Sequence, residues 1–245
     1  MLEIIFPEQC SCCNEVAGGA YSICATCRSG FRKLDKFHCC SRCGVPFGFF
    51  DSMQGAGEAS AERDRKNLCA DCLGGKYSFY KARSVLLYKG ALRELVQVFK
   101  YEGDLRAGDT LSRYLAENVP EDLEPYDIII PVPIHIKKLR EREFNHAVIL
   151  CRKLSKVSNT LCDFELLKKI RETTSQFEIK NERERRKNVS GAFSVPFPER
   201  IRRRSVLVVD DVYTTGSTSD ECAKTLIKSG ASRVQVLTLA RAKSL

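Results

Sequence analysis

The chain has 245 residues, of which 40 are Lys or Arg and 31 are Asp or Glu, so its formal net charge is +9. This length accommodates one sizeable domain and a small one, and the absence of any run of about 18 apolar residues excludes a membrane-spanning helix. The N-terminal residues lack the basic start and apolar core of a signal peptide, so we expect a cytoplasmic protein. The basic balance favours polyanionic partners without identifying one.

Cysteine dominates the N-terminal part of the chain. Eight of the 13 cysteines form four Cys-x-x-Cys pairs before residue 73. In a reducing compartment such pairs are poor disulfide candidates, whereas two pairs together supply the four thiolates of a structural zinc site. A thioredoxin-like redox site would need one such pair at a helix start within an α/β pattern, so two structural zinc ions are predicted. The expected ligands are Cys10, Cys13, Cys24 and Cys27 for one ion and Cys40, Cys43, Cys69 and Cys72 for the other.

This sequential pairing of the cysteines is the simplest, and an interleaved pairing remains open. Cys12 and Cys39 are close neighbours of assigned ligands in the sequence, so either could bind zinc in place of its neighbour. Residues 1–76 are too few and too polar to hold a core without metal, which predicts a zinc-binding module followed by a second domain over residues 77–245. Within the module, residues 48–67 are expected to be a mobile insertion. The aromatic residues beside the fourth pair either stack nucleobases or pack the module on its neighbour.

From residue 82 onward the pattern alternates between strands and helices. Strands are predicted at 84–88, 126–130, 161–167, 206–209 and 234–239, and helices at 91–101, 105–117, 144–156 and 219–229. The apolar run at 206–209 is typical of a strand buried on both faces of a parallel sheet. The alternation therefore predicts an α/β fold, with a parallel sheet flanked by helices. The charged stretch that follows residue 170 is predicted to be partly helical, with a polar start at 173–176 that could close as a lid.

Two acidic residues follow the strand at 206–209. Asp210 and Asp211 precede a loop of small hydroxylated residues that leads into the helix at 219–229. The unpaired N–H groups of a helix N-terminus, entered through a glycine-bearing loop, can bind a phosphate. The two carboxylates suit hydroxyl donors or a hydrated magnesium ion. A ligand that combines these groups is phosphoribosyl pyrophosphate (PRPP), and its predicted phosphate-binding residues are Thr214, Thr215, Gly216, Ser217 and Thr218.

Other motifs fit this stretch less well. A receiver domain carries its acidic pair near its start and a phospho-accepting Asp on a later strand, whereas Asp220 is the only Asp after Asp211. The sequence contains neither a P-loop nor a Gly-x-Gly-x-x-Gly dinucleotide motif. Pro131, Val132 and Pro133 end the strand at 126–130, at the edge where open α/β sheets bind ligands.

Several motifs occur together in a recognisable order. They are Phe99-Lys100-Tyr101-Glu102-Gly103-Asp104, Pro131-Val132-Pro133, Phe144-Asn145 and Glu184-Arg185-Arg186-Lys187-Asn188-Val189, with the cysteine module before them and the acidic loop after them. With these motifs the chain resembles the ComF/GntX family of phosphoribosyltransferase-like proteins over nearly its whole length. The resemblance implies a double zinc ribbon at 1–76 and a type I phosphoribosyltransferase-like domain at 77–245. It also implies a role in natural transformation, in which relatives act inside the cell on incoming single-stranded DNA.

The resemblance also implies roles for individual residues. Asp210 and Asp211 would hold the ribose hydroxyls and magnesium at the catalytic position, and residues 131–134 would form the loop that binds the diphosphate. The residues implied for the lid and for neutralising diphosphate or a DNA backbone are Gln176, Arg185, Arg186, Lys137, Lys138, Arg140 and Arg142. Two positions depart from the family pattern. Thr214 stands where some phosphoribosyltransferases have a carboxylate base, and Glu143 would repel a nearby diphosphate.

Together these observations predict a protein that handles incoming single-stranded DNA and retains a site for PRPP and magnesium. The alternative is an active phosphoribosyltransferase that transfers the sugar to an acceptor and releases diphosphate, although nothing in the sequence identifies that acceptor. A third hypothesis is a structural adaptor whose zinc module recruits proteins of the DNA-uptake machinery.

Overall fold

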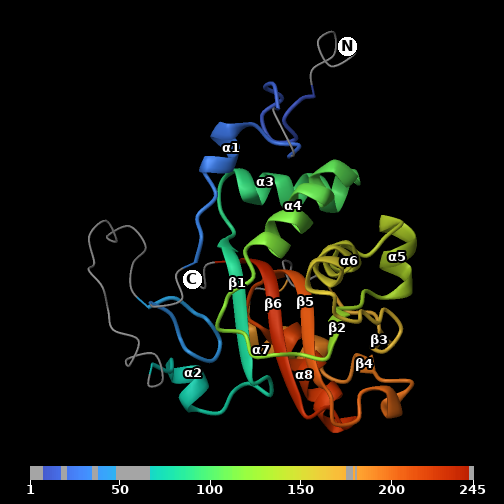
Figure 1. Ribbon diagram of the computed structural model, residues 1–245. Helices are drawn as coiled ribbons and strands as arrows, with labels where there is room; N and C mark the ends of the chain where they lie inside the picture. The colour runs from blue at the N-terminus through green and yellow to red at the C-terminus, as the bar shows by residue number, and fades with distance from the viewer. Residues whose placement is uncertain are drawn as a thin grey trace.

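Figure 1 shows the computed structural model, which describes residues 8–17, 21–34, 38–47, 67–174, 179 and 181–242. The insertion predicted at 48–67 lies outside the described residues except for Asn67, and Gln176 lies outside them as well. Within the described ranges, no helix combines the length and the apolar character that crossing a bilayer requires.

A four-stranded parallel sheet forms the centre of the structure. Its strands are β1 (Lys81–Leu87), β2 (Ile128–Pro131), β5 (Ser205–Tyr213) and β6 (Arg233–Arg241), in the order β1-β6-β5-β2. All three neighbouring pairs of strands are parallel. The predicted fold class, a parallel sheet flanked by helices after a cysteine-rich module, is confirmed.

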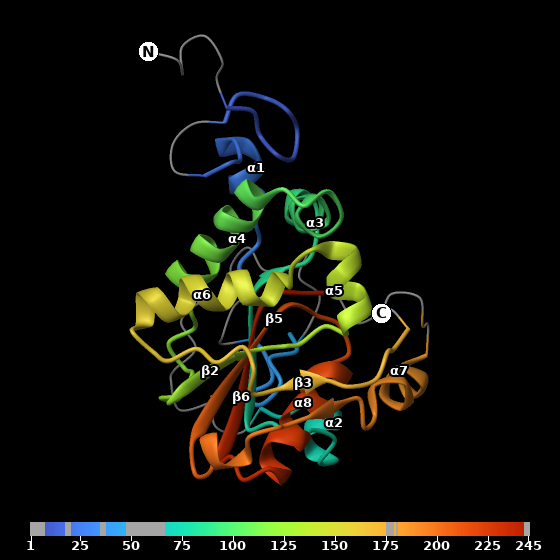
Figure 2. The same ribbon diagram turned by 90° about the vertical axis from the view of Figure 1, so that its right-hand side faces the viewer.

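Helices cover both faces of this sheet (Figure 2). On one face lie α3 (Ala91–Gln97), α4 (Leu105–Glu117) and α6 (His146–Ser158), and on the other lies α8 (Ser217–Lys228) beside α7 (Glu182–Val189). A π-helical turn, η4 (Val98–Glu102), extends α3. The shorter elements are α1 (Ala25–Ser29), α2 (Ala70–Leu73), α5 (Ile136–Arg142), η5 (Pro198–Arg200) and a separate antiparallel pair of β3 (Lys168–Lys169) and β4 (Phe193–Ser194).

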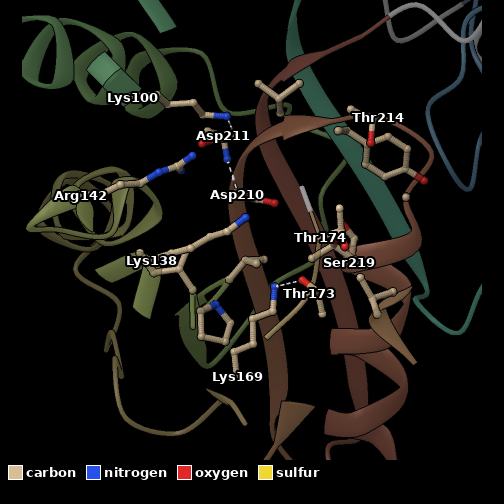
Figure 3. Close-up of a pocket in the computed structure, with 18 of the residues that line it drawn as sticks. Lys100, Lys138, Arg142, Lys169, Thr173, Thr174, Asp210, Asp211, Thr214 and Ser219 are labelled. Atoms are coloured by element: carbon tan, nitrogen blue, oxygen red, sulfur yellow. Dashed lines mark hydrogen bonds and ion pairs between the residues drawn. The ribbon is translucent and has the colours of Figure 1, made fainter. Parts of the chain in front are cut away.

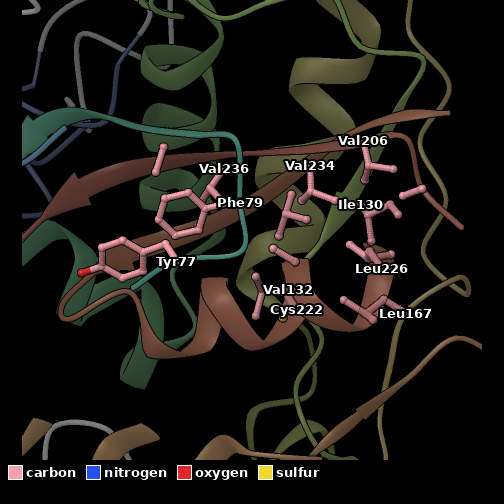
Figure 4. Packing of buried hydrophobic residues seen from close by; sticks show 14 of the residues in the cluster. Tyr77, Phe79, Ile130, Val132, Leu167, Val206, Cys222, Leu226, Val234 and Val236 are labelled. Atoms are coloured by element: carbon pink, nitrogen blue, oxygen red, sulfur yellow. The ribbon is translucent and has the colours of Figure 1, made fainter. Parts of the chain in front are cut away.

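The side chains of β5 alternate between two hydrophobic cores. Val206 and Val208 pack with Leu226 of α8 on one face, where Figure 4 shows part of the cluster. Leu207 and Val209 join the core beneath α4 and α6. All four β5 side chains are completely buried, as predicted for this strand, and each contributes about 2 kcal/mol through removal from water.

The strand predicted at 161–167 is wrong in its extent. Cys162 forms an isolated parallel bridge with Ile129 of β2, and the regular pairing ends there. The Asp163 carboxylate accepts a hydrogen bond from the Glu165 amide at 2.9 Å, a local turn that leads the chain away from the sheet edge. Leu166 and Leu167 are buried in the core on the α8 face instead of extending the sheet.

Candidate functional site

A pocket opens at the carboxyl ends of β5 and β2, beside the start of α8 (Figure 3). Asp210 and Asp211 line it from β5, Val132 and Pro133 from the end of β2, and Thr173 and Thr174 from the segment before α7. The loop that precedes α8 supplies Thr214 and Gly216, and the first turn of α8 supplies Thr218. The structure thus brings together segments that are more than 30 residues apart in the sequence and that were assigned to one ligand.

The phosphate loop, residues 214–218, enters α8 through a left-handed glycine. Gly216 has a φ of 78°, and a Cβ added to it would lie 2.1 Å from the Tyr213 hydroxyl, so this position requires glycine. Its carbonyl accepts the Asp220 amide at 2.8 Å, and the Thr215 and Ser217 hydroxyls lie 2.9 Å apart. The positive end of α8 therefore faces the pocket, where it favours an anion.

The two carboxylates of β5 have different environments. The Lys100 ammonium lies 2.8 Å from an Asp211 oxygen, and the two side chains are only 8% and 15% exposed. Burial acts to lower the pKa of Lys100, but the charge and hydrogen bond of Asp211 outweigh it and the pKa is raised. Burial, followed by the charge of Asp211, raises the pKa of Asp210 to about 7. Asp211 is therefore already neutralised by Lys100, whereas Asp210 is the carboxylate that a ligand hydroxyl can meet.

Three further cations line the pocket: Lys138, Arg142 and Lys169. Among the described residues, none of the three forms an ion pair with a carboxylate. The Lys169 ammonium donates to the Thr173 hydroxyl at 2.6 Å, and burial, together with the charge of Lys138, lowers its pKa. The Arg142 guanidinium lies 5.4 Å from the ring centroid of Tyr101 at the pocket rim. Cations held without acidic partners make the pocket attractive to a multiply charged anion.

Lys100 and Lys169 were not predicted as site residues. Lys100 belongs to the motif at 99–104, which is a usable signal, but its pairing with Asp211 depends on how α3 and η4 dock on β5. Lys169 lies on a two-residue strand that no periodicity marks. Its position depends on the β3–β4 pair, which only the folded chain forms.

Other residues assigned to the lid or to anion binding lie outside the pocket lining. Lys137 pairs with Glu172 at 2.7 Å, and Arg140 is exposed. Arg185 donates to the Ile179 carbonyl at 2.7 Å, and Arg186 lies 3.2 Å from Asp220 at the start of α8. These contacts bind α7 to its neighbours instead of directing its arginines at a ligand.

Asn188 and Asn145 fix the backbone of two pocket segments. Asn188 forms two hydrogen bonds with the backbone of Thr174, of 3.1 and 2.8 Å. The Asn145 amide donates to the Val132 carbonyl at 3.0 Å, and its oxygen caps α6. Glu143 is exposed and absent from the pocket lining, so its charge does not face the site.

The cysteines form two compact groups of four. In each group the ligand atoms lie within 4.8 Å of one another. The first cysteine group is Cys10, Cys13, Cys24 and Cys27, and the second cysteine group is Cys40, Cys43, Cys69 and Cys72. The structure therefore has the sequential pairing. Cys12 and Cys39 belong to neither group, and the Cys12 thiol lies 3.5 Å from the Ala91 carbonyl.

Both groups fit structural zinc. Four thiolates at this separation provide the closed tetrahedral set of a structural site. Backbone amides point at the sulfurs, with the Cys69 amide 3.4 Å from Cys40 Sγ and the Cys27 amide 3.4 Å from Cys24 Sγ. Such donors stabilise metal-bound thiolates and orient them.

A cysteine-rich module followed by a parallel sheet with helices on both faces defines a class of protein, the zinc-ribbon proteins with an α/β domain. The model of the Double zinc ribbon domain matches residues 1–73. A glutamine PRPP amidotransferase from B. subtilis is similar over 52% of this chain and 25% of its own length, with 19% identity and a TM-score of 0.35. A purine phosphoribosyltransferase from Pyrococcus horikoshii is similar over 55% of this chain and 82% of its own, with 15% identity and a TM-score of 0.34.

Full-length relatives narrow this class to a family. The chain is 31% identical to the DNA utilization protein YhgH of Escherichia coli O157:H7, over 96% of this chain and 97% of the relative. It is 29% identical to Competence protein F of Haemophilus influenzae, over 90% of each chain. The chain belongs to the ComF/GntX family.

Proposed function

We propose that this protein handles incoming single-stranded DNA in the cytoplasm during natural transformation and binds PRPP with magnesium in the pocket at Asp210. The convergence of the phosphate loop, Asp210 and three cations without acidic partners in one pocket carries the PRPP part of the proposal. The names of the relatives, which refer to DNA utilization and competence, support the DNA part. The net charge of +9 suits a DNA backbone, and the zinc module is the candidate contact for DNA-uptake proteins.

The pocket suggests how PRPP would be held. The 5-phosphate would bind the phosphate loop and the N-terminus of α8, and the ribose hydroxyls would donate to Asp210. The diphosphate would then face residues 131–134 together with Lys138, Arg142 and Lys169. Because Asp211 is already paired with Lys100, a magnesium ion would be held mainly by the diphosphate oxygens and Asp210.

A specific observation also favours the alternative, an active phosphoribosyltransferase. The pKa of Asp210 is raised to about 7, so this carboxyl can exchange a proton near neutral pH. Displacement at ribose C1 would release diphosphate, whose charge the pocket cations would stabilise.

Calorimetric titration of the full chain with PRPP and magnesium tests the site. Asp210→Asn combined with Asp211→Asn is expected to weaken binding by about tenfold or more, because charged hydrogen bonds to the ribose are lost. Asp109→Asn, which changes an exposed carboxylate on α4, is the matched control and should bind as the wild type does. Equal affinities for the double variant and the control would contradict the site. Repeating the titration with a short single-stranded oligonucleotide already bound shows whether PRPP and DNA binding are coupled.

The same titration with Lys169→Met tests the cationic side of the pocket. We expect a loss of about tenfold for PRPP and for inorganic diphosphate. Lys168→Met is the neighbouring control, since Lys168 pairs with Glu165 and does not line the pocket. Because the pKa of Lys169 is lowered, its contribution should disappear as the pH rises, before that of an ordinary lysine. Equal losses for the two variants would exclude a specific role for Lys169.

A further inference from the structure

Tyr77 links the second cysteine group to the phosphate loop. Its ring is buried and stacks on Phe79 (Figure 4), with ring centroids 4.8 Å apart. Both rings belong to the same core as Cys40, Cys43 and Cys72. Its hydroxyl donates to the backbone carbonyl of Thr215 at 3.3 Å. A side chain in the same core as the metal ligands therefore holds a backbone group of the loop.

Arg241 forms a second link between the same two places. It is 3% exposed, and its guanidinium donates to the carbonyl of Cys43 while lying 3.9 Å from the ring centroid of Tyr213. The Tyr213 hydroxyl lies directly against Gly216, where no side chain would fit. The position of the Tyr213 ring therefore sets the path of the loop backbone, and Arg241 connects that ring to a metal ligand.

A third contact reaches the first turn of α8. The amide of Ser78 donates to the Asp220 carboxylate at 2.5 Å, and the other Asp220 oxygen lies 3.2 Å from Arg186. The same guanidinium nitrogen of Arg186 lies 3.4 Å from the Lys76 carbonyl. The segment that follows the second cysteine group is thus attached both to the loop and to the helix that the loop begins.

Among the residues that the structure describes, the first cysteine group has no comparable connection to the phosphate loop. Its contacts go to α3 and α4, through Ser22 with Thr110, Ser11 with Asp104, and the Cys12 thiol with the Ala91 carbonyl. Within the described part of the chain, no hydrogen bond joins residues 8–34 to residues 213–220. The two cysteine groups therefore differ in whether neighbouring residues link them to the phosphate loop.

We propose that Tyr77 and Arg241 are positioning residues through which the second cysteine group holds the phosphate loop in its anion-binding shape. Phosphate binding then depends on the metal at that group and is independent of the metal at the first. That the bound phosphate belongs to PRPP rests on the proposed function. The coupling between the second cysteine group and the phosphate loop rests only on the contacts of Tyr77 and Arg241.

The ligand test removes one hydroxyl. Tyr77→Phe keeps the buried stacked ring and deletes only the donor to Thr215, so PRPP affinity in the full chain should fall about three- to tenfold. Zinc content and thermal stability should stay close to those of the wild type, which separates positioning from unfolding. The control Tyr21→Phe deletes a hydroxyl that donates to Glu117 at 2.5 Å beside the first group, and it should leave affinity unchanged. Wild-type affinity for Tyr77→Phe would overturn the role of Tyr77.

Amide hydrogen exchange tests the coupling without any ligand. Cys69→Ser and Cys13→Ser each remove one ligand of one group, and zinc content should fall from two ions to one in both. Exchange at residues 215–220 should become faster only in Cys69→Ser, and by more there than in β2 and α6 of the same variant, which separates release of the loop from global destabilisation. Unchanged exchange there would overturn the inference even if the wild type binds PRPP. Faster exchange together with no PRPP binding by the wild type would reject the proposed ligand and keep the coupling.

Discussion

The two cysteine groups have the same ligands but different surroundings. In the first group only Cys10 is buried, and Cys13 is exposed. In the second group Cys40, Cys43 and Cys72 are all buried, in one core with the side chains of β5, β6 and α8. In the first group only Cys10 enters the core of the α4 face, and Cys24 and Cys27 pack against it partly exposed, whereas three of the four ligands of the second group are buried in the core of the α8 face. Identical metal chemistry can thus stabilise either a peripheral module or the core of the fold.

Buried arginines reinforce this difference. Arg83 of β1 donates to the carbonyl of Ser41 at 2.9 Å, and Arg241 of β6 donates to that of Cys43. Near the first group the main polar contact is the Ser22 amide with the Thr110 hydroxyl, at 2.9 Å. Arginine side chains of the sheet thus hold the backbone of the second group directly, whereas the first group contacts α3 and α4, and β1 is bonded to the backbone that follows that group, at Arg32 and Leu34.

Among the predicted changes in stability, the loss of metal ligands should be the largest. Cys40→Ser with Cys43→Ser is expected to lower the free energy of unfolding of the whole chain by about 3 kcal/mol or more, because metal binding and core packing are lost together. Cys10→Ser with Cys13→Ser should open mainly residues 8–34. Denaturant unfolding of both double variants, with limited proteolysis to locate the opened segment, measures the difference. Equal losses in the free energy of unfolding for the two double variants would contradict the conclusion that the second group contributes more to the stability of the fold.

Removal of the ion pair between Asp122 and Arg83, beside the second group, should lower the stability by an intermediate amount. Asp122 neutralises Arg83, whose side chain is 7% exposed, so Asp122→Asn leaves a buried charge with a weakened partner. We expect a loss of about 2 to 4 kcal/mol in the free energy of unfolding. Asp109→Asn removes the partner of Arg113 on the surface of α4, and it should cost less than about 1 kcal/mol. Similar losses in urea unfolding would show that the two pairs are equivalent.

Loss of the single hydrogen bond between the Ser22 amide and the Thr110 hydroxyl, near the first group, should lower the stability least. Thr110→Val keeps the side-chain shape but leaves the buried Ser22 amide without its acceptor, at a cost of about 1 to 2 kcal/mol. Ser22→Ala, the control, removes only the hydroxyl and retains the amide bond, so it should cost less. Thermal unfolding of the two variants distinguishes these results, and a larger loss for Ser22→Ala would contradict this role of Thr110.

The sequence was informative where the physical signal is local. The apolar run at 206–209 predicted a strand buried on both faces, and that is its environment. The segment 161–167 is less uniform, because Asp163 and Glu165 interrupt its apolar residues. Only Leu166 and Leu167 fill the core, after a turn at Asp163, whereas Leu161 and Phe164 are exposed. The uninterrupted apolar run therefore predicted both burial and strand pairing, whereas the interrupted segment is buried and paired only in part.

For the candidate site, the sequence indicated the acidic loop and the proline segment and misplaced several cations. Arg185 and Arg186 stand in a basic run, yet their guanidinium groups bind the Ile179 carbonyl and Asp220. Lys169, in a stretch with no motif, lines the pocket instead. Long basic side chains reach several angstroms in any direction, so their targets depend on neighbours that local patterns do not specify.

By itself the sequence determined the cysteine pairs, the alternation of strands and helices, and the glycine-bearing loop after two acids, because each depends on residues close together in the chain. The tertiary structure decided the sequential grouping of the cysteines, the neutralisation of Asp211 by Lys100 and the attachment of the second group to the phosphate loop. These features join residues up to 198 positions apart, as in the bond between Arg241 and Cys43. Contacts of that kind exist only once the sheet has formed, because packing of its two faces brings the distant segments together.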